Sequence, residues 1–289
     1  MAATEETALL EGRAWADLSD WRKSFVSGSD ARAWLQDLIT AEIDDLEPGF
    51  ARRSLLLSPT GRIRADFTVA VLPSGLLLVQ DPRQPHPIER LLAPYVLSSD
   101  VHLRDRTEDL GLLAFPNAEP PSDSRTFAYR PSTLGTGFDA LVEQPEDRER
   151  LTVGGQPVSR ERLEARRIER GEARFPVDLT ESSLPHEAGL DHAIAYGKGC
   201  FLGQEAVARV RNLGHPPRVV LALRADSPVA AGDPIVSNDR AVGEITSVAD
   251  PGTAAIGRVS WAARDAELAT RAGVELDVLD LASGTPGAS

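Results

Sequence analysis

The sequence is poor in cysteine and lacks the segments that direct a chain to a membrane. Its 289 residues include one cysteine, Cys200, so an intramolecular disulfide is excluded and a reducing compartment is favoured. Residues 1–6 have neither the basic nor the apolar region of a signal peptide, and they are too acidic for a transit peptide. No apolar run approaches the length that crosses a bilayer. We therefore expect a cytoplasmic protein with no membrane partner.

Positive charge is also scarce relative to negative charge. The formal net charge is -13, whereas binding along a nucleic-acid backbone requires clustered lysine and arginine. We therefore expect no nucleic-acid partner, and the excess of carboxylates favours basic or metal-laden proteins instead. A local basic pocket for a small anionic ligand stays open, because arginine is plentiful. Apolar residues at 42% and charged residues at 26% are typical of a folded domain.

Several common catalytic and cofactor motifs are missing. The glycines at 135–137 lack the rest of a dinucleotide fingerprint, and no phosphate loop or nucleophile elbow is present. His186, Glu187, Asp191 and His192 do not have the spacing of a helical zinc motif, so we expect no metal site. A single cysteine cannot supply the four thiolates that an iron–sulfur cluster usually takes. A stably held cluster would need ligands from elsewhere.

The hydrophobic pattern predicts an α+β fold with a C-terminal β-barrel. A helix capped by Ser29 is expected to precede two strands, 54–58 and 62–72, joined by Pro59-Thr60-Gly61. In the second strand the apolar residues at 63, 65, 67, 69 and 71 share one face, and Asp66 lies on the polar face. Helices are expected near 88–93, 146–151 and 159–170, and a long irregular segment covers 175–199.

Beyond residue 214 the pattern is all-β. Five short strands are expected, at 218–224, 234–237, 241–248, 253–259 and 273–279. The resulting division has an N-terminal α+β part at 1–109, a second α+β part at 110–213, a barrel at 214–281 and a disordered tail at 282–289.

The lone cysteine lies in the run Lys-Gly-Cys-Phe-Leu-Gly-Gln-Glu at 198–205, just before a stretch that reads as a helix. An ammonium group and a helix N-terminus both stabilise negative charge on sulfur, so Cys200 is a candidate reactive thiolate. An isolated cysteine is equally often a small buried hydrophobe. The local sequence leaves both interpretations open.

Several of these motifs together resemble the YgfZ-type folate-binding family, which is related to the glycine-cleavage T-protein, an aminomethyltransferase. The resemblance covers most of the chain and is weakest around 110–150. The segments that carry it are 27–31, 35–36, 57–63, 167–171, 175–178, 184–187, 198–205 and 242–247. It implies a T-protein-like, ring-shaped arrangement of parts around a tetrahydrofolate site, with a terminal β-barrel.

The resemblance also implies roles for particular residues. The pterin-binding glutamate of the family corresponds to Glu169, where a carboxylate can accept two hydrogen bonds from the amino-pyrimidine edge; by composition alone Glu169 is an exposed helix-end residue. Lys198 falls where it could reach the folate glutamyl carboxylate or tune Cys200. Asp66 either points into a central cavity as a catalytic carboxylate or is a solvated strand residue. The T-protein branch has two adjacent acidic residues where this chain has Ala65-Asp66, which places aminomethyl transfer in doubt.

Three functions follow from this resemblance. The first is a tetrahydrofolate-binding protein that supports assembly or repair of iron–sulfur clusters in client enzymes, with Cys200 as its functional thiol and no classical turnover. Its partners would be folate and cluster-assembly proteins or client enzymes. The second is a folate-dependent aminomethyltransferase, in which Asp66 assists one-carbon transfer. The third is a scaffold that has lost its ligand and binds protein partners.

Overall fold

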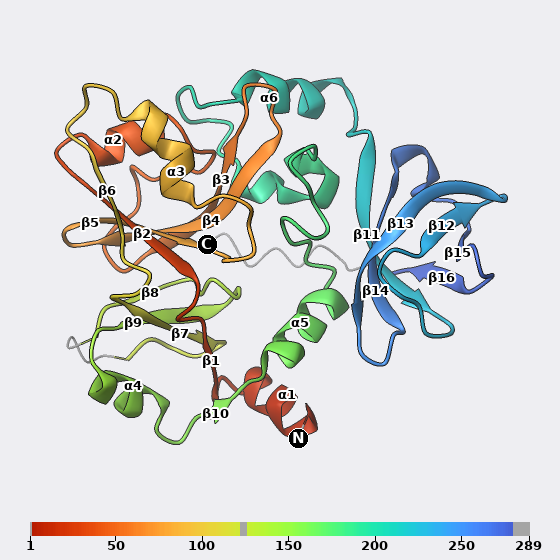
Figure 1. Cartoon of the computed structure of the whole chain (residues 1–289), viewed down its shortest axis with the longest axis horizontal. Helices are drawn as coiled ribbons and strands as arrows, with labels where there is room; N and C mark the ends of the chain where they lie inside the picture. Colours follow the sequence, from red (N-terminus) through yellow and green to blue (C-terminus); the bar gives the residue numbers. More distant parts are fainter. Residues whose placement is uncertain (1, 122–125, 280–289) are drawn as a thin grey trace. The chain divides into compact units, whose positions relative to one another are not determined.

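The computed structural model describes residues 2–121 and 126–279, so the predicted tail at 282–289 lies outside the described residues. The chain forms two compact units (Figure 1). The first takes in Met1–Leu57, Arg64–Arg162 and Ala193–Leu202, and the second takes in Ser58–Ile63, Leu163–His192 and Gly203–Ser289, as far as each is described. Both units are therefore assembled from segments far apart in the sequence, and the predicted division into consecutive parts stays a prediction.

The first unit contains two five-stranded sheets, β3-β4-β5-β2-β6 and β10-β1-β7-β9-β8. Apart from the parallel pair β1–β10, the strand pairs whose register is known are antiparallel. The strands are β1 (Ala14–Asp17), β2 (Arg22–Ser27), β3 (Ala51–Leu57), β4 (Ile63–Leu72), β5 (Gly75–Gln80), β6 (His102–Asp105), β7 (Gly111–Pro116), β8 (Ala128–Tyr129), β9 (Gly137–Val142) and β10 (Gln156–Pro157). The helices are α1 (Ala2–Leu10), α2 (Ala31–Gln36), α3 (Ile88–Leu92), η1 (Ala93–Tyr95) and α4 (Pro145–Thr152). Helix α5 (Arg160–Glu169) begins in the first unit and ends in the second, and Ile63, the first residue of β4, belongs to the second unit.

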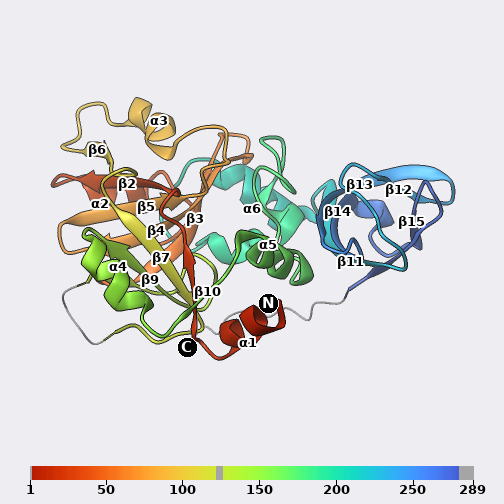
Figure 2. The same ribbon diagram turned by 60° about the horizontal axis from the view of Figure 1, so that its bottom comes forward.

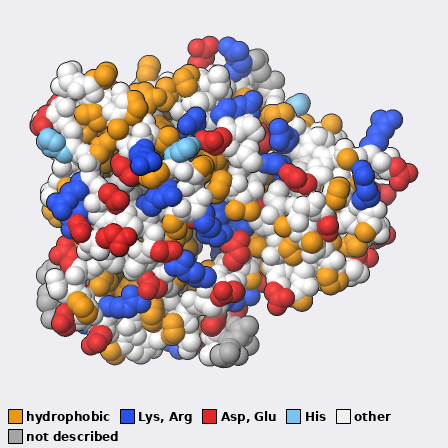
Figure 3. Space-filling view, in the orientation of Figure 1, with side chains coloured by type: hydrophobic (Ala, Val, Ile, Leu, Met, Phe, Trp, Pro, Cys, Tyr) orange, Lys and Arg blue, Asp and Glu red, His pale blue; other side chains and the backbone are white. Residues whose placement is uncertain are grey.

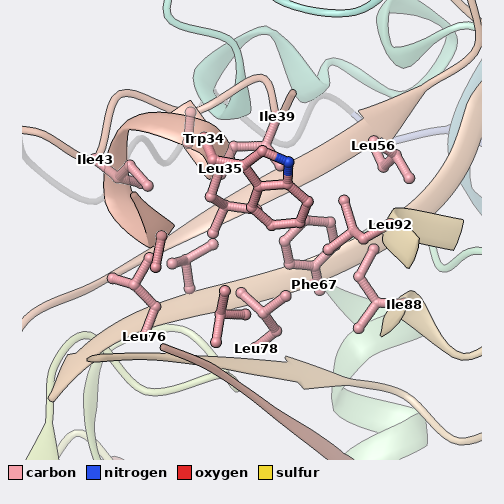
Figure 4. Close-up of a cluster of buried hydrophobic side chains, with 14 of the residues drawn as sticks. Trp34, Leu35, Ile39, Ile43, Leu56, Phe67, Leu76, Leu78, Ile88 and Leu92 are labelled. Atoms are coloured by element: carbon pink, nitrogen blue, oxygen red, sulfur yellow. The ribbon is translucent and has the colours of Figure 1, made fainter. Parts of the chain in front are cut away.

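The main core of the first unit lies between the sheet containing β4 and helices α2 and α3. The apolar face predicted for β4 is confirmed, because Ile63, Ala65, Phe67, Val69 and Val71 are all buried. Figure 4 shows Trp34 and Leu35 of α2 packed over the side chains of this sheet, with Ile88 and Leu92 of α3 beside them. The core fixes both faces of β4, since its polar residues must then lie on the opposite side.

The turn before α2 differs in detail from the prediction. Ser29 is not the N-cap; Asp30 holds that position, but its side chain makes no capping hydrogen bond to the helix and instead accepts the N–H of Asp100 at 2.8 Å. The Ser29 hydroxyl instead donates to Asp100 Oδ2 at 2.8 Å, because the segment before β6 lies against this turn. Gly28 makes that close approach possible: its φ is +118°, and a Cβ there would lie 2.0 Å from the carbonyl oxygen of Asp100.

We predict that Gly28→Ala lowers the free energy of unfolding by about 3 kcal/mol or more, since left-handed backbone strain and a backbone clash add together. Gly135→Ala is the matched control, because its φ is +110° and nothing lies within 4 Å of the added Cβ. Urea unfolding followed by circular dichroism compares the two. Equal losses of stability would show that the contact with Asp100 contributes nothing.

The second unit is built around the predicted barrel. Six strands close in the order β11-β14-β13-β12-β15-β16, of which Figure 2 labels all but β16. The core of the barrel includes Leu223, Ile235, Ile245 and Leu276. The strands are β11 (Arg218–Ala225), β12 (Pro234–Ser237), β13 (Arg240–Ala249), β14 (Ala254–Ser260), β15 (Leu268–Thr270) and β16 (Glu275–Val278). The unit also contains α6 (Gln204–Leu213), η2 (Pro185–Ala188) and η4 (Trp261–Ala263), and η3 (Leu190–Ala193) ends at its boundary. The predicted α+β fold with a C-terminal barrel is confirmed.

Candidate functional site

Cys200 is a free and exposed thiol at the end of a loop that is firmly held in the first unit. Two backbone contacts fix the start of the loop: the N–H of Ala195 donates to the carbonyl of Thr40 at 2.8 Å, and the hydroxyl of Thr40 donates to the carbonyl of Ala193 at 2.7 Å. On the other side of the thiol Phe201 is buried. Cys200 is therefore presented to solvent between two anchored neighbours, which excludes the buried-hydrophobe interpretation.

Lys198 ties the same loop to α2. Its ammonium donates to the carbonyl of Gln36 at 2.5 Å and to that of Ala41 at 2.7 Å, and it lies 5.5 Å from the centre of the Phe201 ring. Among the described residues it makes no hydrogen bond to Cys200. The geometry gives Lys198 an anchoring role, while its predicted contact with folate or effect on the thiol stays a prediction. The helix predicted after the cysteine is α6, which begins four residues further along the chain.

The sequence has only two lysines, and both are held in this way. Lys23 donates to the carbonyls of Ser19 and Trp21, at 2.8 and 2.7 Å. Burial lowers the pKa of each ammonium to about 8, and nearby carboxylates, among them Glu42 beside Lys198, oppose the shift. A charged lysine therefore costs the folded state more than the unfolded state.

From these pKa values we predict that the free energy of unfolding rises as the pH increases from about 8 towards 10.5. In that window the unfolded chain binds more protons than the folded chain, so raising the pH favours folding. Lys198→Met should flatten part of this rise. NMR titration of ¹³C-labelled lysine checks the cause directly, and two resonances that titrate at the ordinary lysine value would contradict it.

Asp66 lies on the polar face of β4, as predicted, but it is neither solvated nor free. Both oxygens accept hydrogen bonds from Arg53 of the neighbouring strand β3, Oδ1 from Nε at 2.9 Å and Oδ2 from Nη2 at 2.5 Å. Gln84 binds the Asp66 backbone on both sides, and the Asp66 side chain is 12% exposed. This bidentate pair with arginine fixes the orientation of the Asp66 carboxylate and occupies one acceptor site on each of its oxygens.

Glu169 is the last residue of α5, in the second unit, and it is exposed. The neighbouring Ile168 packs against Ala249 and Ile256 of the barrel, so the helix end is fixed to β13 and β14. A carboxylate at a helix C-terminus is disfavoured by the helix dipole. A residue that breaks such a local rule on a well-anchored element is a reasonable ligand-binding candidate.

A second carboxylate, Glu187, lies in the same unit; from the sequence it was considered only among possible metal ligands. Its side chain is 1% exposed. Oε1 accepts the N–H of Leu184 at 3.0 Å and lies 3.8 Å from Nη1 of Arg62, whereas Oε2 has no hydrogen-bond partner among the described residues. A buried acceptor without a donor costs about 1–3 kcal/mol, which a ligand N–H would relieve. The available sequence signal was Pro185 opening a short helix, followed by a glutamate at the third helical position.

Charge on the face in Figure 3 is mixed, with basic and acidic side chains interspersed. Within residues 2–121 and 126–279, no group of three or more histidine, cysteine, aspartate or glutamate side chains is arranged to hold a metal ion. No described helix is both long enough and apolar enough to cross a membrane. The expectations about nucleic acid and cellular location remain predictions.

Comparison with known proteins identifies a superfamily to which the chain is similar. The GCVT N-terminal domain model matches residues 1–119. An aminomethyltransferase of Herpetosiphon aurantiacus is 25% identical over 268 residues, which is 81% of this chain and 74% of that protein. An iron-sulfur cluster assembly factor IBA57 homolog, mitochondrial, of Chaetomium globosum is 27% identical over 300 residues, or 87% and 67%. These matches support the aminomethyltransferase-like superfamily.

A solved structure agrees at the level of the fold. The glycine cleavage system aminomethyltransferase T from Bartonella henselae has a TM-score of 0.78 with 20% identity, covering 94% of this chain and 87% of that one. A chloroplastic protein of Arabidopsis thaliana is 23% identical over 261 residues, which is 80% of this chain but only 60% of that protein. The chain therefore spans less than two thirds of that relative. Membership of the narrower YgfZ-type family stays a prediction.

Proposed function

We propose that this protein binds tetrahydrofolate or another reduced folate and supports the assembly or repair of iron–sulfur clusters in client enzymes, with Cys200 as its functional thiol. The observation that carries the proposal is the exposed Cys200, held between Lys198 and the buried Phe201. A fixed, accessible thiol can act as a thiolate, which is the form of cysteine that ligates iron or attacks another sulfur. Two relatives whose names state iron-sulfur cluster assembly lend support.

Folate binding rests on the two carboxylates of the second unit. Glu169 offers an exposed carboxylate at the end of an anchored helix, and Glu187 offers a buried oxygen that has no donor. The amino-pyrimidine edge of a pterin presents adjacent N–H donors, which a carboxylate accepts in pairs. We infer that Glu169 holds this edge and that Glu187 accepts a further N–H. The aminomethyltransferase relatives and the matching fold are compatible with this ligand class.

The hydrogen bonds and low exposure of Asp66 favour a role in cluster support over aminomethyl transfer. A carboxylate that assists one-carbon transfer has to reach the reacting atoms, whereas Asp66 is bound by Arg53 through both oxygens and is 12% exposed. Its neighbour in sequence, Ala65, is buried and carries no carboxylate, so the adjacent pair of acids found in the T-protein branch is not present here. Clients would then be cytoplasmic iron–sulfur enzymes or the proteins that load them.

Aminomethyl transfer is the second candidate, favoured by the named activity of several relatives and by the solved structure with the same fold. Asp66→Asn discriminates between the candidates. If the variant abolishes a measurable folate-dependent release of ammonia or an amine, while Cys200→Ser keeps it, the transferase assignment is correct. We expect no such turnover from the wild type.

Anaerobic calorimetry tests the ligand. The wild type should bind tetrahydrofolate, and p-aminobenzoylglutamate, which lacks the pterin, should bind much more weakly. Equal affinities for both compounds would contradict pterin recognition. Failure of the wild type to bind any reduced folate would favour a scaffold that captures protein partners.

A further inference from the structure

A buried network in the second unit connects the end of α5 to the barrel. Arg167 lies two residues before Glu169, and its guanidinium uses all five N–H donors. They go to Glu164 at 3.3 and 2.7 Å, to the carbonyl of Glu172 at 2.5 Å, to Asp178 Oδ2 at 2.7 Å and to the hydroxyl of Ser247 at 2.9 Å. No N–H donor of the side chain is left over.

Asp178 completes the network from the other side. Its side chain is fully buried, and each oxygen accepts two hydrogen bonds. Oδ2 takes the Arg167 guanidinium and the N–H of Arg174 at 2.9 Å, and Oδ1 takes the hydroxyls of Thr246 at 2.5 Å and Ser247 at 2.7 Å. The end of α5, the turn that follows it and barrel strand β13 are thereby joined through one charge pair.

Stability alone is a poor explanation for this network. A buried ion pair is costly to desolvate, and apolar residues of similar volume often stabilise a protein as well or better. Burial acts to lower the pKa of Arg167, but the hydrogen bond to Glu164 and the charge of Asp178 outweigh it and raise the pKa, so the guanidinium stays charged. What a fully satisfied polar network provides is a single defined arrangement of the groups that it joins.

The geometry of the α-helix connects this buried network to the position of Glu169. Residues two apart in a helix point about 200° apart, so the side chains of Arg167 and Glu169 lie on opposite sides of the last turn. Arg167 and Ile168 face the barrel and Glu169 is exposed. A helix end normally frays, but here its last turn is fixed by contacts with β13.

We propose that Arg167, Asp178 and Ser247 are positioning residues that set the placement of Glu169 for folate. The proposal rests on the proposed function, since it assumes that Glu169 contacts the ligand. On this proposal the barrel contributes to folate binding, although no barrel residue needs to contact the ligand. Loosening the network should reduce affinity through Glu169 alone.

Ser247→Ala is the main test, because it removes two hydrogen bonds and leaves the Arg167–Asp178 pair intact. Thr270→Val is the matched control, a buried barrel hydroxyl that accepts the N–H of Val274 in a different part of the barrel. We expect Ser247→Ala to weaken tetrahydrofolate binding about tenfold and Thr270→Val to leave it unchanged. Hydrogen exchange of amides 166–172 should be faster in Ser247→Ala only. Asp178→Asn provides a second, stronger perturbation.

A double-mutant cycle distinguishes positioning from general weakening. In a Glu169→Gln background, Ser247→Ala should cause no further loss of affinity. Two results would overturn the positioning role and leave folate binding standing. In the first, Ser247→Ala binds tetrahydrofolate as tightly as the wild type does. In the second, Ser247→Ala lowers the affinity as much in the Glu169→Gln background as it does in the wild type. Absence of binding to the wild type would overturn both proposals.

Discussion

Cys200→Ser is expected to reduce the activity of iron–sulfur client enzymes to the level of a strain that lacks the gene. Serine keeps the size of the side chain but its hydroxyl is not ionised near neutral pH, so it cannot replace a thiolate that ligates iron or attacks sulfur. Because the side chain is exposed and forms no hydrogen bond among the described residues, the substitution should leave the fold unchanged. Client-enzyme activity in cell extracts, with the variant present at the wild-type level, checks this.

The control for Cys200→Ser is its own folate binding. Calorimetry with tetrahydrofolate should give the wild-type affinity, since Glu169 and Glu187 lie in a different segment of the chain. A serine variant that restores client activity fully would show that the thiol is dispensable. A variant that loses both functions would indicate damage to the loop fixed by Lys198.

Glu169→Ala is expected to weaken tetrahydrofolate binding about 100-fold, because two charge-assisted hydrogen bonds to the pterin edge are lost together. Glu161→Ala is the matched control, an exposed glutamate in the first turn of the same helix α5. It removes the same charge about two turns away, so a general electrostatic effect would appear in both variants. Calorimetry separates them, and equal affinities for the two variants would contradict a direct contact from Glu169.

The sequence predicted those features that depend on local periodicity. Alternation along β4 identified its buried face, and regular turn signals predicted five of the six barrel strands. The sixth, β15, was missed because Leu268–Thr270 is too short to show a period of two. Ser29 was a chemically suitable N-cap, but the competing acceptor Asp100 lies 71 residues further along the chain. Contacts at such separations leave no mark in a local pattern.

The candidate site residues also divide into what the sequence could indicate and what it could not. The resemblance drew attention to Asp66, Glu169, Lys198 and Cys200, but their partners could not be read from the sequence. Nothing in a strand pattern shows that Arg53 occupies both oxygens of Asp66. The carbonyls that bind Lys198 lie about 160 residues earlier, at Gln36 and Ala41. Backbone carbonyls belong to every residue type, so composition cannot reveal such an anchor.

The most direct test of the account asks whether the folate site and the thiol serve one function. The measurement is client iron–sulfur enzyme activity in the deletion strain, expressing Glu169→Ala or the control Glu161→Ala at equal levels. The account predicts that Glu161→Ala restores activity and Glu169→Ala does not, although Cys200 is intact in both. The account would be contradicted if Glu169→Ala restored client-enzyme activity fully although calorimetry shows that the variant no longer binds folate. Cluster support would then proceed without the ligand.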